Sequence, residues 1–194
     1  DVTPELAKFN VEINAQPLEF EGDCLAVLEK KVHDACVIVR EAARAEGADI
    51  VMTGILPTLT QSDLVDSNMF DSPRYRALDE TLRKMRGGEY SVNIEGTDQL
   101  ALTHDNVMIE ACNTSFQVHF QVAPHEFARF YNLAQAITGP VLAAAVNSPV
   151  FMQQRLWKET RVALFSQSID SRSAAHKARR ARPRVVFGDE WVRE

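Results

Sequence analysis

The stretch Thr114-Ser-Phe-Gln-Val-His-Phe-Gln-Val122 decides the fold that we expect for this chain. Apolar and polar residues alternate strictly in it, which is the period of a β-strand with one buried face. We therefore predict a strand over residues 107–122, with Gln117, His119 and Gln121 together on one face. A neutral imidazole between two amides can ligate a metal or contact a phosphate. A wet strand face with an incidental histidine explains the same pattern equally well.

Apolar periodicity in the rest of the chain predicts a mixture of helices and strands. The predicted helices cover residues 23–46, 74–86 and 124–149, and the predicted strands cover residues 9–20, 49–54 and 89–102. We expect a short helical turn in residues 61–73, and either a helix or an irregular segment in residues 155–168. This order lacks regular alternation of strand and helix. It predicts an α+β fold on a largely antiparallel sheet.

Residues of known capping preference mark the helix ends. Asp23 is a plausible N-cap of the first helix, and Gly47 is a plausible stop. Gly87-Gly88 ends the second helix in the same way.

The composition is that of an ordinary globular domain, with 194 residues, 45% hydrophobic and 25% charged. The formal net charge of -6 disfavours non-specific binding to nucleic acid, which depends on clustered cations. Three widely spaced cysteines fit a reducing compartment. No apolar run is long enough for a membrane span, and no signal peptide is visible. We expect a cytoplasmic protein whose partners are small molecules, not nucleic acids or membranes.

Carboxylates on predicted strands form a further candidate site. Glu12 and Asn14 share a polar strand face, and Glu110 lies upstream of His119 on the same predicted strand. Carboxylates with few nitrogen ligands suit Mg²⁺ or Mn²⁺, provided that these strands are neighbours. An ordinary solvated face is the alternative, because acidic residues are mostly exposed.

Cationic side chains could bind an anionic substrate at two places. Arg161 ends the stretch Arg155-Leu-Trp-Lys-Glu-Thr-Arg161, and a guanidinium suits bidentate binding of a carboxylate or phosphate. Arg74-Tyr75 at a helix start could bind an anionic group, although a helix surface commonly carries such residues. The basic run 172–184 is either a solvated loop or an anion-binding tail. The usual signatures of nucleotide-binding loops, serine hydrolases and zinc proteases are absent.

Seven short stretches point in the same order to one family. They are Pro4-Glu-Leu-Ala-Lys-Phe-Asn-Val-Glu-Ile-Asn14, Gly54-Ile-Leu-Pro-Thr58, Arg74-Tyr75, Thr114-Ser-Phe-Gln-Val-His-Phe-Gln-Val122, Tyr131-Asn132, Asn147-Ser-Pro149 and Trp157-Lys-Glu-Thr-Arg161. Together they resemble the glutamate-cysteine ligase type 2 family, the bacterial carboxylate-amine ligases. The SFQVHFQV stretch and the region from NSP to ETR are the most specific parts of the resemblance.

The resemblance implies a glutamine-synthetase-like fold, in which a curved antiparallel sheet forms a funnel with helices packed on its outer face. The inner face of such a funnel holds ATP, Mg²⁺ or Mn²⁺, and glutamate. The implied reaction phosphorylates the γ-carboxylate of glutamate with ATP. An amine, such as that of cysteine, then displaces phosphate to make an amide.

The resemblance also implies roles for individual residues. The metal ligands would be Glu12 and His119, the catalytic residues Arg161 and the weaker candidate Glu159, and the substrate-binding residues Arg74, Tyr75, Gln117 and Gln121. Arg161 would bind phosphate or the substrate carboxylate, while Arg74 and Tyr75 would help to recognise glutamate.

The chain departs from the family pattern at both ends. Family members carry an earlier strand with a Glu-x-Glu metal motif, and more sheet beyond Phe187-Gly-Asp-Glu-Trp191. We therefore expect residues 1–194 to form a single domain that resembles the central part of a larger catalytic domain. A non-catalytic fragment or degenerate ligase, binding a partner or forming a homo-oligomer, is the first alternative. A nucleic-acid-binding domain that uses residues 172–184 is the second.

Overall fold

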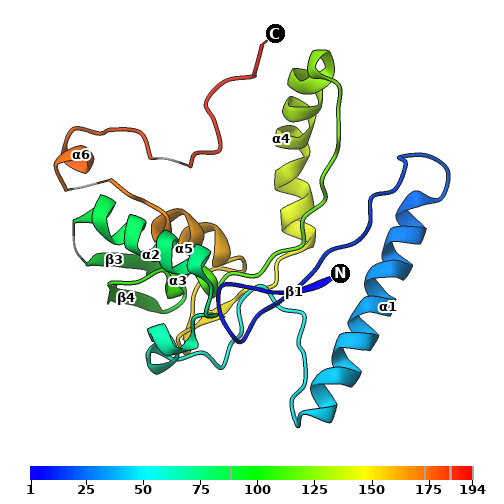
Figure 1. Ribbon diagram of the computed structural model, residues 1–194. Coiled ribbons are helices and arrows are strands. Elements are labelled where there is room, and N and C mark those ends of the chain that lie inside the picture. Colours follow the sequence, from blue (N-terminus) through cyan, green and yellow to red (C-terminus); the bar gives the residue numbers. More distant parts are fainter. Residues whose placement is uncertain (88, 173, 184, 194) are drawn as a thin grey trace.

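The computed structural model describes residues 1–87, 89–172, 174–183 and 185–193. It combines helices with short antiparallel strand pairs, so the α+β class is confirmed (Figure 1). The strands are β1 (Val2–Pro4), β2 (Val11–Ile13), β3 (Tyr90–Glu95), β4 (Gln99–His104), β5 (Val150–Phe151) and β6 (Gln154–Arg155). The α-helices are α1 (Cys24–Ala45), α2 (Pro73–Arg86), α3 (Met108–Ala111), α4 (Phe127–Ala144), α5 (Arg161–Ser168) and α6 (Ala174–Ala178). The 3₁₀ turns are η1 (Gln61–Asp63), η2 (Asp66–Asn68) and η3 (Pro124–Glu126).

The β3–β4 hairpin is the centre of the apolar core. Its register pairs Val92 with Leu102 and Ile94 with Leu100, and all four side chains are buried on one face. The opposite face is polar and exposed, as alternation in a half-buried strand requires. Helix α5 packs on β3 and also contacts α3, so the hairpin and these two helices share one core. This core positions the start of α5, where Arg161 lies.

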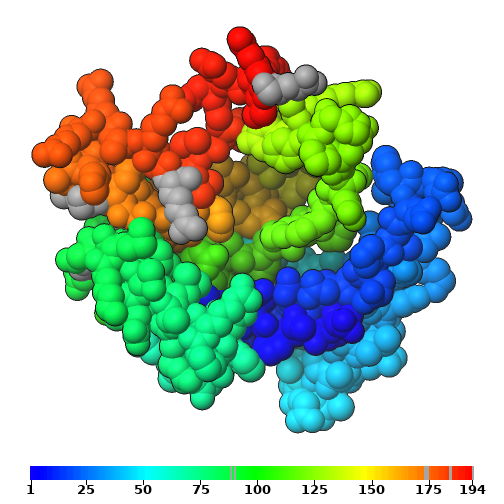
Figure 2. Space-filling model, turned by 45° about the horizontal axis from the view of Figure 1, so that its top comes forward, coloured from blue at the N-terminus to red at the C-terminus, as the bar shows by residue number. Residues whose placement is uncertain are grey.

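Helices α1 and α4 extend away from this core (Figure 1). Helix α1 has Cys36 as its buried residue, and none of the described residues of α4 is buried. Figure 2 shows a face that is hollowed at its centre, between the blue N-terminal part, the green segment leading into α4 and the orange C-terminal part. No helix in the described ranges is both long and apolar enough to cross a membrane.

The helix predictions agree with the structure. Helices α1, α2 and α4 lie where apolar periodicity predicts them, and α5 occupies the second half of residues 155–168. Gly47 and Gly87 adopt left-handed conformations with φ of 75°, as helix-ending glycines do. Asp23 occupies the N-cap position of α1, but its side chain makes no capping hydrogen bond. Gly88 of the predicted helix stop, and Ser173 and Arg184 of the basic run, lie outside the described residues.

The predicted strand over residues 107–122 is wrong. Its first part forms α3, because the side chains of Val107, Met108 and Ile109 are all buried and do not alternate. Its second part, residues 115–122, makes no backbone hydrogen bond with another described segment. Alternation predicts a strand only where a neighbouring strand supplies hydrogen-bond partners, and here none of the described segments does.

Two other strand predictions also need correction. Residues 49–54 form no strand, and in residues 9–20 only Val11–Ile13 pairs, with β1. Val11 is about half exposed, so this pair does not carry a buried face. The described strands form three separate two-stranded pairs. The single curved sheet that the resemblance implies is therefore not confirmed.

Candidate functional site

Arg161 begins α5, and its guanidinium is fixed on two sides. Its Nε donates a hydrogen bond to Glu159 Oε1, and its Nη1 donates to the carbonyl oxygen of Thr114 at 2.6 Å. The backbone N–H of Arg161 donates to Ser148 Oγ at 3.2 Å. Within the described chain, Nη2 has no hydrogen-bond partner, and 22% of the side chain is exposed. One edge of a positioned cation is therefore open to an anion.

Glu159 is the buried acid of this ion pair, with only 7% of its side chain exposed. Its Oε1 also accepts a hydrogen bond from Ser148 Oγ at 2.8 Å, and its Oε2 accepts one from the backbone N–H of Asn147 at 2.9 Å. Burial raises the pKa of Glu159, but the hydrogen bonds from Arg161, Ser148 and Asn147 together lower this pKa by more than burial raises it. The net pKa lies below the ordinary value, so this carboxyl is ionised at neutral pH.

Four segments distant in sequence meet at this ion pair. Gly54 donates its N–H to the carbonyl oxygen of Asn147 at 2.9 Å and accepts the N–H of Thr114 at 2.9 Å. Ser148 forms a parallel bridge with Glu159. These contacts join the GILPT, TSF, NSP and ETR stretches, four of the seven on which the resemblance rests. We call this group, Gly54, Thr114, Ser148, Glu159 and Arg161, the Arg161 centre.

A second group contains Glu12, Arg74 and Tyr75. The Arg74 guanidinium carbon lies 5.9 Å from the centroid of the Tyr75 ring. Burial raises the pKa of Tyr75, and the charges of Glu5, Glu12 and Glu110 raise it too, while Arg74 opposes them. The pKa of Glu110 is raised by burial and by Glu5. Two predicted site residues, Glu12 and Arg74, are therefore within electrostatic range of a third, Tyr75, as are two further acids.

The polar side chains of residues 115–121 lie together even though the segment is unpaired. His119 Nε2 contacts Gln117 Oε1 at 3.1 Å, and Gln117 Nε2 donates to Ser115 Oγ at 3.1 Å. These contacts place Gln117 and His119 on the same side of the chain. Gln121 is exposed. The segment is exposed and does not line a sheet.

Glu12 and His119 do not assemble into a metal centre. Over the described ranges, no three His, Cys, Asp or Glu side chains are grouped so that they could hold a metal ion. Glu12 Oε2 instead accepts a hydrogen bond from Thr3 Oγ1 at 3.1 Å. Neither residue belongs to a group of three such side chains among the described residues, so we assign no chemical step to a metal here. The ligand roles of Glu12 and His119 stay predictions.

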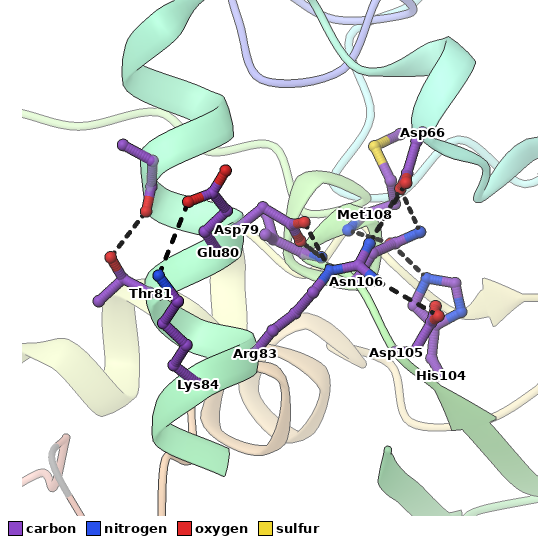
Figure 3. A network of polar contacts seen from close by, with 12 residues as sticks. Asp66, Asp79, Glu80, Thr81, Arg83, Lys84, His104, Asp105, Asn106 and Met108 are labelled. Carbon is purple, nitrogen blue, oxygen red and sulfur yellow. Dashed lines mark hydrogen bonds and ion pairs between the residues drawn. The ribbon is translucent and has the colours of Figure 1, made fainter. Parts of the chain in front are cut away.

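Sequence reasoning missed a network around Arg83 on α2 (Figure 3). Arg83 Nε donates to Asp79 Oδ2 at 2.6 Å, and its other nitrogens pair with Asp66 and Asp105. Asp79 also accepts the backbone N–H of Val107 at 2.9 Å. The acid and base spaced four residues apart on a predicted helix were the available signal. No signal in the sequence indicates that Asp66 and Asp105 also meet Arg83.

Comparison with known proteins now adds the family. The model of glutamate-cysteine ligase family 2 matches residues 1–189. The chain belongs to this family. Searches of curated proteins and of solved structures found no match. Membership of glutamate-cysteine ligase family 2 supports a ligase-type enzyme, and the Arg161 centre unites four of the stretches that carry the resemblance.

Proposed function

We propose that this protein is an ATP-dependent ligase that joins the γ-carboxylate of glutamate, or a related carboxylate, to an amine such as that of cysteine. The family match over residues 1–189 is the observation that carries this proposal. The open edge of the Arg161 guanidinium supports it, because both substrates of the first step are anions. Mg²⁺ or Mn²⁺ is the proposed metal, on the strength of the family alone, and would neutralise phosphate charge when bound.

The proposed reaction has two steps. A γ-carboxylate oxygen of glutamate attacks the terminal phosphorus of ATP, the bond to the bridging oxygen breaks, and ADP leaves. The amine nitrogen then attacks the acyl carbon, the bond to the phosphate oxygen breaks, and the nitrogen loses a proton. Phosphoryl transfer of this kind depends mainly on positioning and on neutralising charge. Arg161 would supply such neutralisation by binding a phosphoryl or carboxylate oxygen through Nη2.

The other predicted residues have separate proposed roles. Arg74 and Tyr75 would recognise glutamate, since a cation and a phenol beside it can bind an α-carboxylate. Glu159 would act on Arg161 by holding it, not by contacting substrate. Gln117 and Gln121 would bind substrate on the face that carries His119.

A binding or assembly module is the second candidate function. It is favoured by residues 115–122, where Phe116 and Phe120 are more than half exposed and the backbone has no partner strand among the described residues. An unpaired extended segment can accept a strand from another chain. A protein that neither binds Mg-ATP nor turns over would favour this function.

Measuring ADP release tests the proposed function. The protein would be incubated with Mg²⁺, ATP and glutamate, with and without cysteine and a panel of other amines. We expect release of ADP that depends on an amine, together with an amide product identified by mass spectrometry. The Arg161→Ala variant is the matched control and should lose this turnover. Absence of both amine-dependent turnover and Mg-ATP binding in the intact protein would refute the ligase proposal.

A further inference from the structure

The space beside Gly54 is filled by the Arg161 side chain. A Cβ atom built on Gly54 would lie 2.6 Å from Arg161 Nε, 2.9 Å from Cζ and 3.0 Å from Cδ. Real Cβ atoms do not approach other atoms so closely, so any side chain here must displace the guanidinium. Gly54 is buried, and the guanidinium packs directly against its Cα.

The requirement for glycine here is one of space and not of backbone conformation. Among the described residues, the glycines with positive φ are Gly22, Gly47, Gly87 and Gly188, and Gly54 is not one of them. An alanine could therefore adopt the backbone conformation of Gly54 without the strain that left-handed residues impose. The three nearest atoms all belong to one side chain, which is held by Glu159 and by the carbonyl oxygen of Thr114.

The same contacts fix which edge of the guanidinium an anion can reach. Nε is committed to Glu159, so the side-on approach that uses Nε and Nη2 is closed. Nη1 is committed to the Thr114 carbonyl oxygen, so Nη2 is the guanidinium nitrogen that has no partner among the described residues. An anion must therefore dock through Nη2.

We propose that Gly54 is a positioning residue: the absence of a side chain there lets Glu159 and Thr114 hold the Arg161 guanidinium so that Nη2 can receive a carboxylate or phosphoryl oxygen. This inference rests on the proposed function for the identity of the anion, but the positioning itself does not. Gly54 acts through Arg161 and does not touch the substrate.

A double-mutant cycle on unfolding tests the positioning without any activity. Urea unfolding would compare the wild type with Gly54→Ala, Arg161→Ala and the double variant. We expect Gly54→Ala to lower the unfolding midpoint in the wild type and to have no effect once Arg161 is Ala, because the clashing atoms are gone. A Gly54→Ala protein that fails to fold, while the double variant folds, gives the same support. An equal loss in both backgrounds would overturn the proposal.

Two further measurements separate this inference from the proposed function. In the ¹⁵N NMR spectrum, the Arg161 Nε–H resonance, assigned by its absence from Arg161→Lys, should be protected from exchange in the wild type and lose protection in Gly54→Ala. Calorimetric affinity for L-glutamate or Mg-ATP should fall about tenfold to a hundredfold in Gly54→Ala. Gly139→Ala, which meets no atom within 4 Å, is the matched control and should change neither.

The outcomes are distinguishable. Absence of glutamate and Mg-ATP binding in the wild type refutes the proposed function but leaves the cycle and the NMR signal to decide the positioning role. Retention of a protected Nε–H resonance and wild-type affinity in Gly54→Ala would overturn the positioning role.

Discussion

The molecule contains two arginine centres that differ in what they leave free. Arg83 directs all three of its guanidinium nitrogens to aspartates, at 2.6 Å to Asp79, 3.2 Å to Asp66 and 3.4 Å to Asp105. Arg161 directs Nε to Glu159 and Nη1 to a carbonyl oxygen, and leaves Nη2 without a partner among the described residues.

This difference separates a structural cation from a binding cation. The charge of Arg83 is more than compensated, so a further anion would gain little there and would be repelled by the surrounding aspartates. In the Arg161 centre, the one cation is paired with one acid, Glu159, and the N–H donors of Nη2 have no partner among the described residues. Arg83 joins α2 to the turns around it, whereas Arg161 joins four segments and still presents an edge to solvent.

Replacing Glu159 should have the largest effect on stability. Replacing it in Glu159→Ala leaves the Arg161 charge unpaired, and removes the acceptor of Ser148 Oγ and of the Asn147 N–H. We expect the free energy of unfolding to fall by about 3 kcal/mol in urea unfolding. Glu159→Gln keeps acceptor capacity through its amide oxygen and should lose less. An unchanged free energy of unfolding in Glu159→Ala would show that the ion pair and these hydrogen bonds contribute little.

Disrupting the Arg83 network should have the next largest effect on stability, and it should leave ligand binding unchanged. Asp79→Ala removes the buried acceptor of the Val107 N–H and of Arg83 Nε, so we expect a loss of about 2 kcal/mol. Asp105→Ala is the matched control, because Asp105 is mostly exposed, and it should change stability by less than about 0.5 kcal/mol. Neither variant should alter calorimetric affinity for glutamate. A changed affinity in Asp79→Ala would remove the distinction between the two arginine centres.

The pH dependence of stability should also distinguish the centres. The pKa of Glu159 is lower in the folded protein than in the unfolded chain, because burial is outweighed by its hydrogen bonds to Arg161, Ser148 and Asn147. Its contribution is therefore fully present above the ordinary pKa of a glutamate and is lost as pH falls through the folded value. We expect Glu159→Gln to reduce the slope of stability against pH on the acid side, measured by urea unfolding from neutral to acidic pH. An unchanged slope would contradict this assignment.

His119 should give the smallest effect on stability. It is exposed, and its hydrogen bond within the described chain is to Gln117 of its own segment, so His119→Ala should change the free energy of unfolding by less than about 0.5 kcal/mol. If His119 is a metal ligand, as predicted, the His119→Ala protein should bind Mg-ATP more weakly than the wild type in calorimetry. Equal affinity in the two proteins would exclude that role. Val118→Ala, on the same segment and about half exposed, is the control for a general effect of truncation.

The sequence predicts the helices well, because their periodicity and glycine stops are local signals. Helix α2 and its end at Gly87 follow from such signals alone. The strands are predicted poorly, because pairing depends on neighbours that alternation does not specify. Residues 115–122 alternate perfectly and yet pair with no described strand.

The candidate site divides in the same way. The sequence identifies Arg161 and Glu159 as candidates. It contains no sign that Gly54 and Thr114, which are 107 and 47 positions before Arg161, lie against that side chain. Ser148 and Gly54 stand in stretches that carry the resemblance, without a role that the sequence itself assigns. Contacts between distant segments had to come from the structure.

Affinity for anions at the two arginine centres tests the central claim most directly. Calorimetry would measure binding of L-glutamate and of Mg-ATP to the wild type, Arg161→Lys and Arg83→Lys, with each protein shown to be folded. We expect Arg161→Lys to weaken binding of at least one of them about tenfold or more, because lysine lacks the guanidinium fork, and Arg83→Lys to leave both unchanged. Wild-type affinity in a folded Arg161→Lys protein would contradict the account.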